Sequence, residues 1–188
     1  MFSDAQLDAR GLMHRKGFPE SYDRSQLLGF LSAVKSGQLK VVVPECSDAM
    51  FGGHALGSTV VDQPDILIVE GLNILQGGHT GKKGHAVSMV SDFLDFSIYV
   101  DAREDHLLAW YLQRFNKLRL GSFQQSSSFW KDCSKMSQGE ADNVALSIWQ
   151  NAILPNLHEN IRPSRERASL ILQKGRDHRV EEVLLKRI

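Results

Sequence analysis

A carboxylate stands directly after a short apolar run in the segment DILIVEGLNIL, residues 65–75. The run ILIV at 66–69 shows no alternation of apolar and polar residues, which predicts a parallel strand buried on both faces. In open α/β sheets the ligand crevice lies at the carboxyl ends of the strands. Glu70 is therefore a candidate to hold a cation or orient a water. The alternative is a strand-end carboxylate paired with a nearby Lys or Arg.

The glycine-rich segment QGGHTGKKGH, residues 76–85, has the residue types of a phosphate-binding loop. The Walker A pattern is G-x-x-x-x-G-K-[ST], in which backbone N–H groups surround the phosphates and the hydroxyl binds Mg²⁺. Counting from Gly81 and Lys82, the first glycine position is Gln76 and the hydroxyl position is Lys83. The sequence therefore favours a surface loop over a phosphate site here.

Histidine and cysteine spacing favours no metal site. His54, His79 and His85 lie near the glycine-rich segment without metal-ligand spacing, and solvent-exposed histidines are the favoured interpretation. Cys46 and Cys133 form neither a CxxC pair nor a disulfide framework, which fits a reducing cytosol. We therefore expect a cytoplasmic protein.

Hydrophobic patterning predicts strands and helices that alternate along the chain. Helices are expected at 23–36, after a capping box formed by Asp101 and Glu104, and after a second one formed by Ser137 and Glu140. The first twenty residues and the segment 45–64 are expected to be irregular. Strands are expected at 41–44, 66–69, 96–100, 168–175 and 180–188. This order predicts an α/β fold with a mostly parallel sheet flanked by helices.

The bulk composition is that of an ordinary globular domain. With 188 residues and 42% hydrophobic residues, the chain can bury one core, and we expect a single domain spanning 1–188. Lys and Arg number 22, as do Asp and Glu, so no overall field attracts nucleic acid or an anionic membrane. No apolar run approaches the roughly 18 residues of a membrane span. We therefore expect neither nucleic acid nor membrane as a partner.

Several longer strings, taken together and in order, resemble type I (bacterial-type) pantothenate kinase. They are GLMHRKGFPESYD (11–23), PDILIVEGLNILQ (64–76), VSDFLDFSIYVDA (90–102), WYLQRF (110–115), NLHENIRPSRERASLILQKGRDH (156–178) and VEEVLLK (180–186). The resemblance implies a P-loop-kinase-like fold and transfer of the ATP γ-phosphate to pantothenate with Mg²⁺, the first step of coenzyme A biosynthesis. It also implies CoA as a feedback inhibitor, and a homodimer or an association with a kinase subunit.

The same resemblance implies roles for individual residues. Glu70 would position the Mg²⁺ on the nucleotide phosphates and Arg114 would contact the phosphates, which makes both catalytic. His178 would bind the nucleotide near the adenine. The side chains expected to contact pantothenate are aromatic: Tyr111, Phe115 and Trp130.

The chain also departs from the family pattern. The family carries its Walker A loop and a T-x-D-G-F aspartate ahead of the GLM string, and neither has a counterpart here. We therefore expect an incomplete, truncated kinase-like domain that is inactive alone, with 66–69 and 96–100 bordering an open slot. Cys46, Asp48 and Ile153 stand where the family has Tyr, His and Asn.

These departures leave two hypotheses open. The chain is either the C-terminal portion of a pantothenate kinase, or a non-catalytic kinase-like paralogue that binds or regulates an active kinase or binds CoA. Simple truncation does not account for altered pocket residues such as Ile153. A uridine-kinase-like enzyme is a weaker third interpretation, because the matching strings are particular to the pantothenate family.

Overall fold

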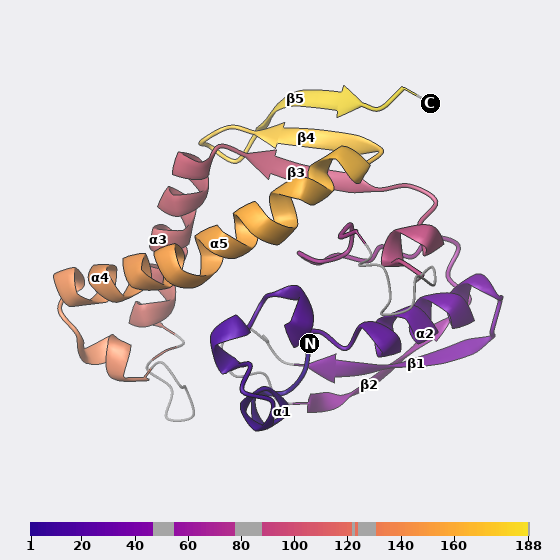
Figure 1. Ribbon diagram of the computed structural model, residues 1–188, viewed down its shortest axis with the longest axis horizontal. Coiled ribbons are helices and arrows are strands. Elements are labelled where there is room, and N and C mark those ends of the chain that lie inside the picture. Colours follow the sequence, from indigo (N-terminus) through magenta and orange to yellow (C-terminus); the bar gives the residue numbers. More distant parts are fainter. Residues whose placement is uncertain (47–54, 78–87, 122, 124–130, 188) are drawn as a thin grey trace. The chain divides into compact units, whose positions relative to one another are not determined.

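The computed structural model describes residues 1–46, 55–77, 88–121, 123 and 131–187 (Figure 1). The chain divides into two compact units, each described here by itself. The first unit comprises Met1–Ser97 and Glu159–Ala168, and the second comprises Ile98–His158 and Ser169–Ile188. Within the described ranges, no helix combines the length and apolarity that crossing a bilayer requires.

The first unit contains two short helices, a β-hairpin and several 3₁₀ turns. Its helices and strands are α1 (Asp4–Ala9), α2 (Arg24–Lys35), β1 (Lys40–Cys46) and β2 (Ala55–Asp62). Its 3₁₀ turns are Met13–Arg15, Pro19–Ser21, Val90–Phe93 and Arg162–Arg167. The largest fully buried side chains of this unit are those of Phe18 and Leu7, which are 1% and 0% exposed.

Local capping explains the two helices of the first unit. Ser3 and Gln6 form a reciprocal capping box at the start of α1, so the expectation of an irregular N-terminal segment is wrong for Asp4–Ala9. The Asp23 carboxylate caps α2 by accepting from the Gln26 backbone N–H at 2.9 Å. The chain leaves α2 through Gly37, whose φ of +78° favours glycine, as the sequence predicted.

The strand prediction at 41–44 is confirmed by β1, but the irregular segment expected at 45–64 is wrong in part. β2 pairs antiparallel with β1, and Val41 and Val42 lie opposite Val61 and Val60. These valines are β-branched residues of the kind that favour strands. Val60 and Val61 favoured a strand in this segment, but the glycines before them led to the prediction of an irregular structure.

The buried strand predicted for the run 66–69 is wrong. These residues are irregular, and the side chains of Ile66 and Ile68 are 80% and 86% exposed. Among the described residues, no strand pairs with this run. An apolar run becomes a strand only when a neighbour satisfies its backbone N–H and C=O groups, so the sequence signal alone was not sufficient.

The second unit combines a three-stranded sheet with a long helix and a helical run. It contains β3 (Ile98–Ala102), α3 (Glu104–Leu120), a 3₁₀ turn (Lys131–Lys135), α4 (Gln138–Ile148), a π-helical turn (Trp149–Ile153), α5 (Leu154–Asn156), β4 (Leu170–Lys174) and β5 (Val180–Leu185). A further π-helical turn, Leu157–Ile161, begins in this unit. The strands confirm those predicted at 96–100, 168–175 and 180–188 to within a few residues.

The sheet of the second unit has the order β3-β4-β5 (Figure 1). β3 runs parallel to β4, and β5 runs antiparallel to β4. The structure is therefore mixed α/β, and the sheet is mixed rather than mostly parallel. β3 has one buried and one exposed side, because Tyr99 is 8% exposed while its neighbour Val100 is 61% exposed.

Capping boxes were predicted at both long helices of the second unit, and one is present. At α4, Ser137 accepts from the Glu140 N–H and the Glu140 carboxylate accepts from the Ser137 N–H, which confirms the prediction. At α3, the residue before the helix is Arg103, and its side chain makes no cap bond. The box expected from Asp101 and Glu104 is therefore wrong, because the strand β3 extends through Asp101.

The helix after α4 widens into a π-helical turn ahead of Pro155. Proline has no N–H to donate four residues back and its ring crowds that carbonyl, so the regular hydrogen-bond pattern cannot continue through it. The Asn151 side-chain amide donates to the Ser147 carbonyl at 2.8 Å, which gives a partner to a carbonyl in the last turn of α4. Ile153 lies in this turn.

We predict that Ser137→Ala lowers the free energy of unfolding by about 1 kcal/mol, because it removes the cap of α4. Ser137 hydrogen bonds also lower the pKa of Glu140, so in the variant this pKa should rise toward its ordinary value. Urea unfolding at pH 7 measures the first effect and carboxyl-carbon NMR titration the second. Ser32→Ala, at an exposed position inside α2, is the control and should change stability by less than about 0.5 kcal/mol. Equal losses in the two variants would contradict the capping role.

Candidate functional site

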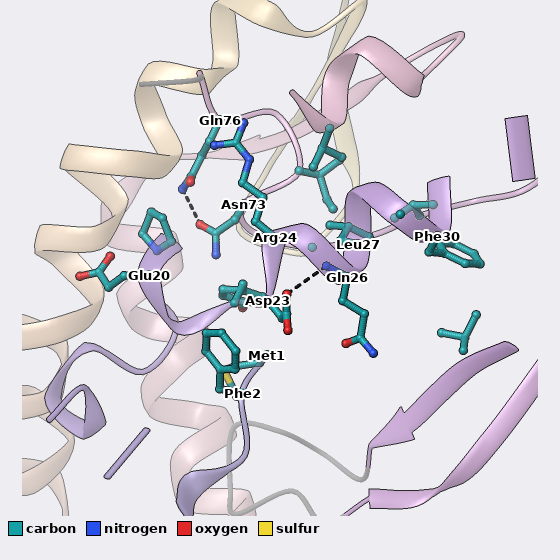
Figure 2. Close-up of a pocket in the computed structure, with 18 of the residues that line it drawn as sticks. Met1, Phe2, Glu20, Asp23, Arg24, Gln26, Leu27, Phe30, Asn73 and Gln76 are labelled. Carbon is teal, nitrogen blue, oxygen red and sulfur yellow. Dashed lines mark hydrogen bonds between the residues drawn. The ribbon is translucent and has the colours of Figure 1, made fainter. Parts of the chain in front are cut away.

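A wide pocket lies in the first unit, between α2, β1 and the segment that follows the run 66–69. Its volume is about 1010 Å³, and its lining includes Tyr22, Asp23, Val42, Glu70 and Asn73. Figure 2 shows Asp23 at the start of α2, directed at the Gln26 backbone. The pocket therefore brings together two of the family-like strings, 11–23 and 64–76.

Glu70 differs from the other acids of this pocket. Its side chain is exposed, and within the described part of the chain it makes no hydrogen bond and no ion pair. The other three carboxylates among the described lining residues have partners: Asp4 with Lys16 at 2.7 Å, Glu20 with Arg15 at 2.5 Å and Asp23 with the Gln26 N–H at 2.9 Å. The Lys or Arg partner considered in the alternative interpretation of Glu70 is not found among the described residues.

The charge of Glu70 acts on Tyr22. Burial raises the pKa of the Tyr22 phenol, and the negative charge of Glu70 raises it further, while a hydrogen bond with Asn73 acts in the opposite direction. Tyr22 therefore stays neutral at physiological pH. It gives the pocket a hydroxyl beside the carboxylate.

Asn73 joins the two strings, and sequence reasoning missed it. Its amide donates to the Gly17 carbonyl at 3.4 Å and its carbonyl oxygen accepts from the Gln76 amide, as Figure 2 shows for the Asn73 and Gln76 pair. Only Glu70 was singled out in the string EGLN. The available signal was the position of Asn73 three residues after Glu70, where a turn brings polar side chains close together.

In the second unit, α3 carries the predicted aromatic contacts. The Tyr111 ring lies 6.2 Å from Phe115 and 5.8 Å from Trp149, measured between ring centroids. Phe115 is 4% exposed and makes an edge-to-face contact with Phe123 at 5.6 Å. The structure therefore brings Tyr111 and Phe115 together, with Phe115 in the aromatic core and Tyr111 half-buried.

Arg114 lies on α3 between these two aromatic residues but is exposed. It makes no hydrogen bond or ion pair with any described residue. Arg119, one and a half turns later, is instead buried, and it donates to the Met136 carbonyl and the Gln138 side chain at 2.8 Å each. Of these two guanidinium groups of α3, Arg114 is thus the one available to a ligand.

His178 lies in the turn between β4 and β5 and stacks on Trp110. The ring centroids are 4.1 Å apart with an interplanar angle of 23°, and His178 has a φ of +68°. The Trp110 indole N–H donates to the Arg176 carbonyl at 3.0 Å, so one side chain of α3 holds both the turn and the imidazole. Trp110 was missed as a site residue, although it opens the WYLQRF string.

Several predicted positions lie outside the described residues or side chains. Trp130, Asp48 and the histidines His79 and His85 are among them, and the side chain of Cys46 is likewise not described. Glu70 belongs to the first unit, whereas Tyr111, Arg114, Phe115 and His178 belong to the second. Over the described parts of the chain, no three His, Cys, Asp or Glu side chains cluster in a way that could hold a metal ion by themselves.

The chain is a mixed α/β protein, and the pocket of its first unit is lined in part by carboxylates. It is 46% identical over 188 residues to the pantothenate kinase of Rhizobium rhizogenes strain K84, and 47% identical over 188 residues to that of Rhodopseudomonas palustris strain BisB18. It is 48% identical over 183 residues to the pantothenate kinase of Shewanella piezotolerans strain WP3. No family model matches.

These matches cover 97–100% of the chain but only 57–59% of the relatives' own length. The chain belongs to the pantothenate kinase family, in which it is homologous to a C-terminal portion of the curated relatives. The resemblance seen in the motifs is thereby confirmed.

Burial raises the pKa of the Tyr111 phenol to about 12 from an ordinary value near 10. We predict a titration midpoint at that pH. The neutral phenol is favoured in the folded state, so this contribution to stability is complete below pH 10 and is lost as the pH rises through 12. Tyr111→Phe should therefore lose less stability between pH 9 and 12 than the unaltered chain, as measured by urea unfolding. Ring-carbon NMR titration reports the midpoint directly, and the resonance missing from the Tyr111→Phe spectrum assigns Tyr111. A Tyr111 midpoint near 10 would contradict the burial argument.

Proposed function

We propose that this chain is the part of a pantothenate kinase that carries substrate-binding and metal-positioning residues, and that the complete kinase transfers the ATP γ-phosphate to pantothenate. The observation that carries the proposal is the 46–49% identity to proteins named pantothenate kinase along 98–100% of the chain. The implied setting is a cytoplasmic, P-loop-kinase-like enzyme of coenzyme A biosynthesis, with CoA as inhibitor. A homodimer or an association with a kinase subunit is part of the same proposal.

Glu70 is proposed to hold Mg²⁺ at the nucleotide. Protein Mg²⁺ sites commonly use one or two carboxylates, with substrate phosphates and waters as the remaining ligands. A single carboxylate without a described partner, in a pocket of about 1010 Å³, fits that donor set better than a closed cage of protein ligands would. The Tyr22 hydroxyl and the Asn73 amide beside it are polar groups that can orient bound water.

Arg114 is proposed to contact the phosphates. Phosphoryl transfer places negative charge on the transferred group, and a guanidinium neutralises such charge while donating hydrogen bonds in a fixed fork. The exposure of Arg114 and its lack of a partner among the described residues support this role. An arginine already engaged as Arg119 is would first have to break its own hydrogen bonds.

Aromatic side chains are proposed to bind the organic parts of the two substrates. Tyr111, Phe115 and Trp130 are assigned to pantothenate, with Phe115 acting from the core as a support for Tyr111. His178 is assigned to the adenine. One face of its ring stacks on Trp110 and the side chain is exposed, so the other face can stack on a base.

The chain alone is proposed to be inactive, because its 188 residues include no G-x-x-x-x-G-K-[ST] string. Such a loop supplies the lysine, the metal-binding hydroxyl and the N–H groups that provide much of the electrostatic catalysis. We expect no pantothenate-dependent ADP release from the chain by itself. We expect turnover when the unmatched part of the Rhizobium rhizogenes kinase is fused to it.

Glu70→Gln in that fusion should lower kcat at least about tenfold, because the neutral amide is a much weaker Mg²⁺ ligand. The decrease should be partly relieved at high Mg²⁺ concentration. Glu182→Gln, an exposed strand position in β5, is the matched control and should leave kcat unchanged. A coupled ADP-release assay measures both. Full activity of the Glu70→Gln fusion would contradict the metal role of this carboxylate.

The second candidate is a non-catalytic, kinase-like paralogue that binds or regulates an active kinase or binds CoA. The observation that favours it is Ile153, an apolar residue in the π-helical turn where the family has a pantothenate-binding Asn. π-helical turns in longer helices are frequent at functional sites. The changes at Cys46 and Asp48 point the same way.

Ile153→Asn in the fusion distinguishes these two candidates. If the chain serves catalysis, the restored amide should lower the KM for pantothenate by up to about tenfold, since one neutral hydrogen bond is worth roughly 0.5–1.5 kcal/mol. Gln150→Asn, at an exposed position of the same turn, is the control and should leave the KM unchanged. A folded fusion without turnover that still binds CoA in calorimetry would favour the paralogue.

A further inference from the structure

One face of the sheet in the second unit is apolar, and the side chains of its outer strands are exposed. In the β3-β4-β5 order, residues that pair across the strands project on the same side. Two cross-strand rows follow from the register: Ile98, Leu170 and Leu185 form one, and Val100, Leu172 and Val183 form the other. All six side chains are aliphatic. We name these six residues the aliphatic face.

The aliphatic face is open to solvent on its outer strands. Ile98 and Val100 of β3 are 51% and 61% exposed, and Val183 and Leu185 of β5 are 57% and 66% exposed. The alternate side of β3 behaves differently, because Tyr99 is 8% exposed. A contiguous aliphatic surface spanning three paired strands is the kind of patch that marks an interaction site.

We propose that the aliphatic face is a docking surface for an amphipathic helix from the part of a pantothenate kinase that this chain does not match. Parallel strand pairs, such as β3 with β4, occur mostly in sheets that helices cover, whereas stacking of two sheets is typical of antiparallel sandwiches. The chain spans only 57–59% of its relatives, so a large part of each relative lies outside the match and can supply this helix.

The residue pattern of the docking helix follows from the aliphatic face. It presents aliphatic residues at i, i+3, i+4 and i+7 to the two rows and a polar side to solvent. Burial of these side chains drives the association without a specific ion pair. The inference depends on the family relationship and on the sheet geometry. It does not require that the assembled protein be catalytically competent.

Co-expression with a probe tests the inference. The probe is the part of the Rhizobium rhizogenes pantothenate kinase outside the match, produced as a separate chain beside the full 188-residue chain. We expect the two to co-purify in a 1:1 ratio, as measured by size-exclusion chromatography with light scattering. Leu185→Asp should reduce the co-purified probe at least about tenfold, because a charge would be placed in an aliphatic interface.

Leu120→Asp is the matched control. Leu120 is a leucine of the same unit with the same 66% exposure as Leu185, but it lies at the end of α3 and outside the aliphatic face. It should leave co-purification unchanged. Val100→Asp provides a second test of the face from another strand, and circular dichroism confirms that each variant is folded.

Several outcomes would overturn the inference. Absence of a complex, or equal loss of the probe with Leu185→Asp and Leu120→Asp, would show that the aliphatic face does not bind it. A stable dimer of the chain alone that dissociates with Leu185→Asp would assign the face to a second copy instead. Because the readout is binding, a complex without kinase activity would contradict the proposed function and leave this inference standing.

Discussion

Backbone pairing between neighbouring strands is the constraint on which both units depend. β4 lies between β3 and β5, so its N–H and C=O groups find partners on each side. The run 66–69 is similarly apolar, yet it is irregular, and no described strand pairs with it. Two segments with similar sequence signals thus differ in structure because one has neighbours and the other has none among the described residues.

Features encoded by a few adjacent residues were predictable from the sequence. The Ser137 capping box and the Gly37 helix end depend only on contacts within one turn, and both are present. Several features that depend on distant partners were not. The irregular run 66–69, the strand β2 and the extension of β3 through Asp101 are set by which strands are available to pair, and periodicity carries no such information.

The candidate sites follow the same division. Glu70 could be singled out because its chemistry is visible in the sequence, and it lines a pocket. The contact of Asn73 with Gly17 could not be foreseen, because 56 residues separate the two. Likewise, Trp110 acquires its role only when the turn that carries His178 folds back onto α3. The family resemblance identified these sequence segments, and hydrogen bonds and ring stacking connect them in the structure.

Each unit exposes large aliphatic side chains among its described residues. In the first unit Ile66 and Ile68 are exposed, and in the second the aliphatic face is exposed. Covering either surface would stabilise the chain, because burial of apolar area contributes about 25 cal/mol per Å². The sequence therefore carries more apolar surface than its own described elements cover. Under the proposals made above, elements of the part of a longer kinase that the chain does not match would cover this apolar surface.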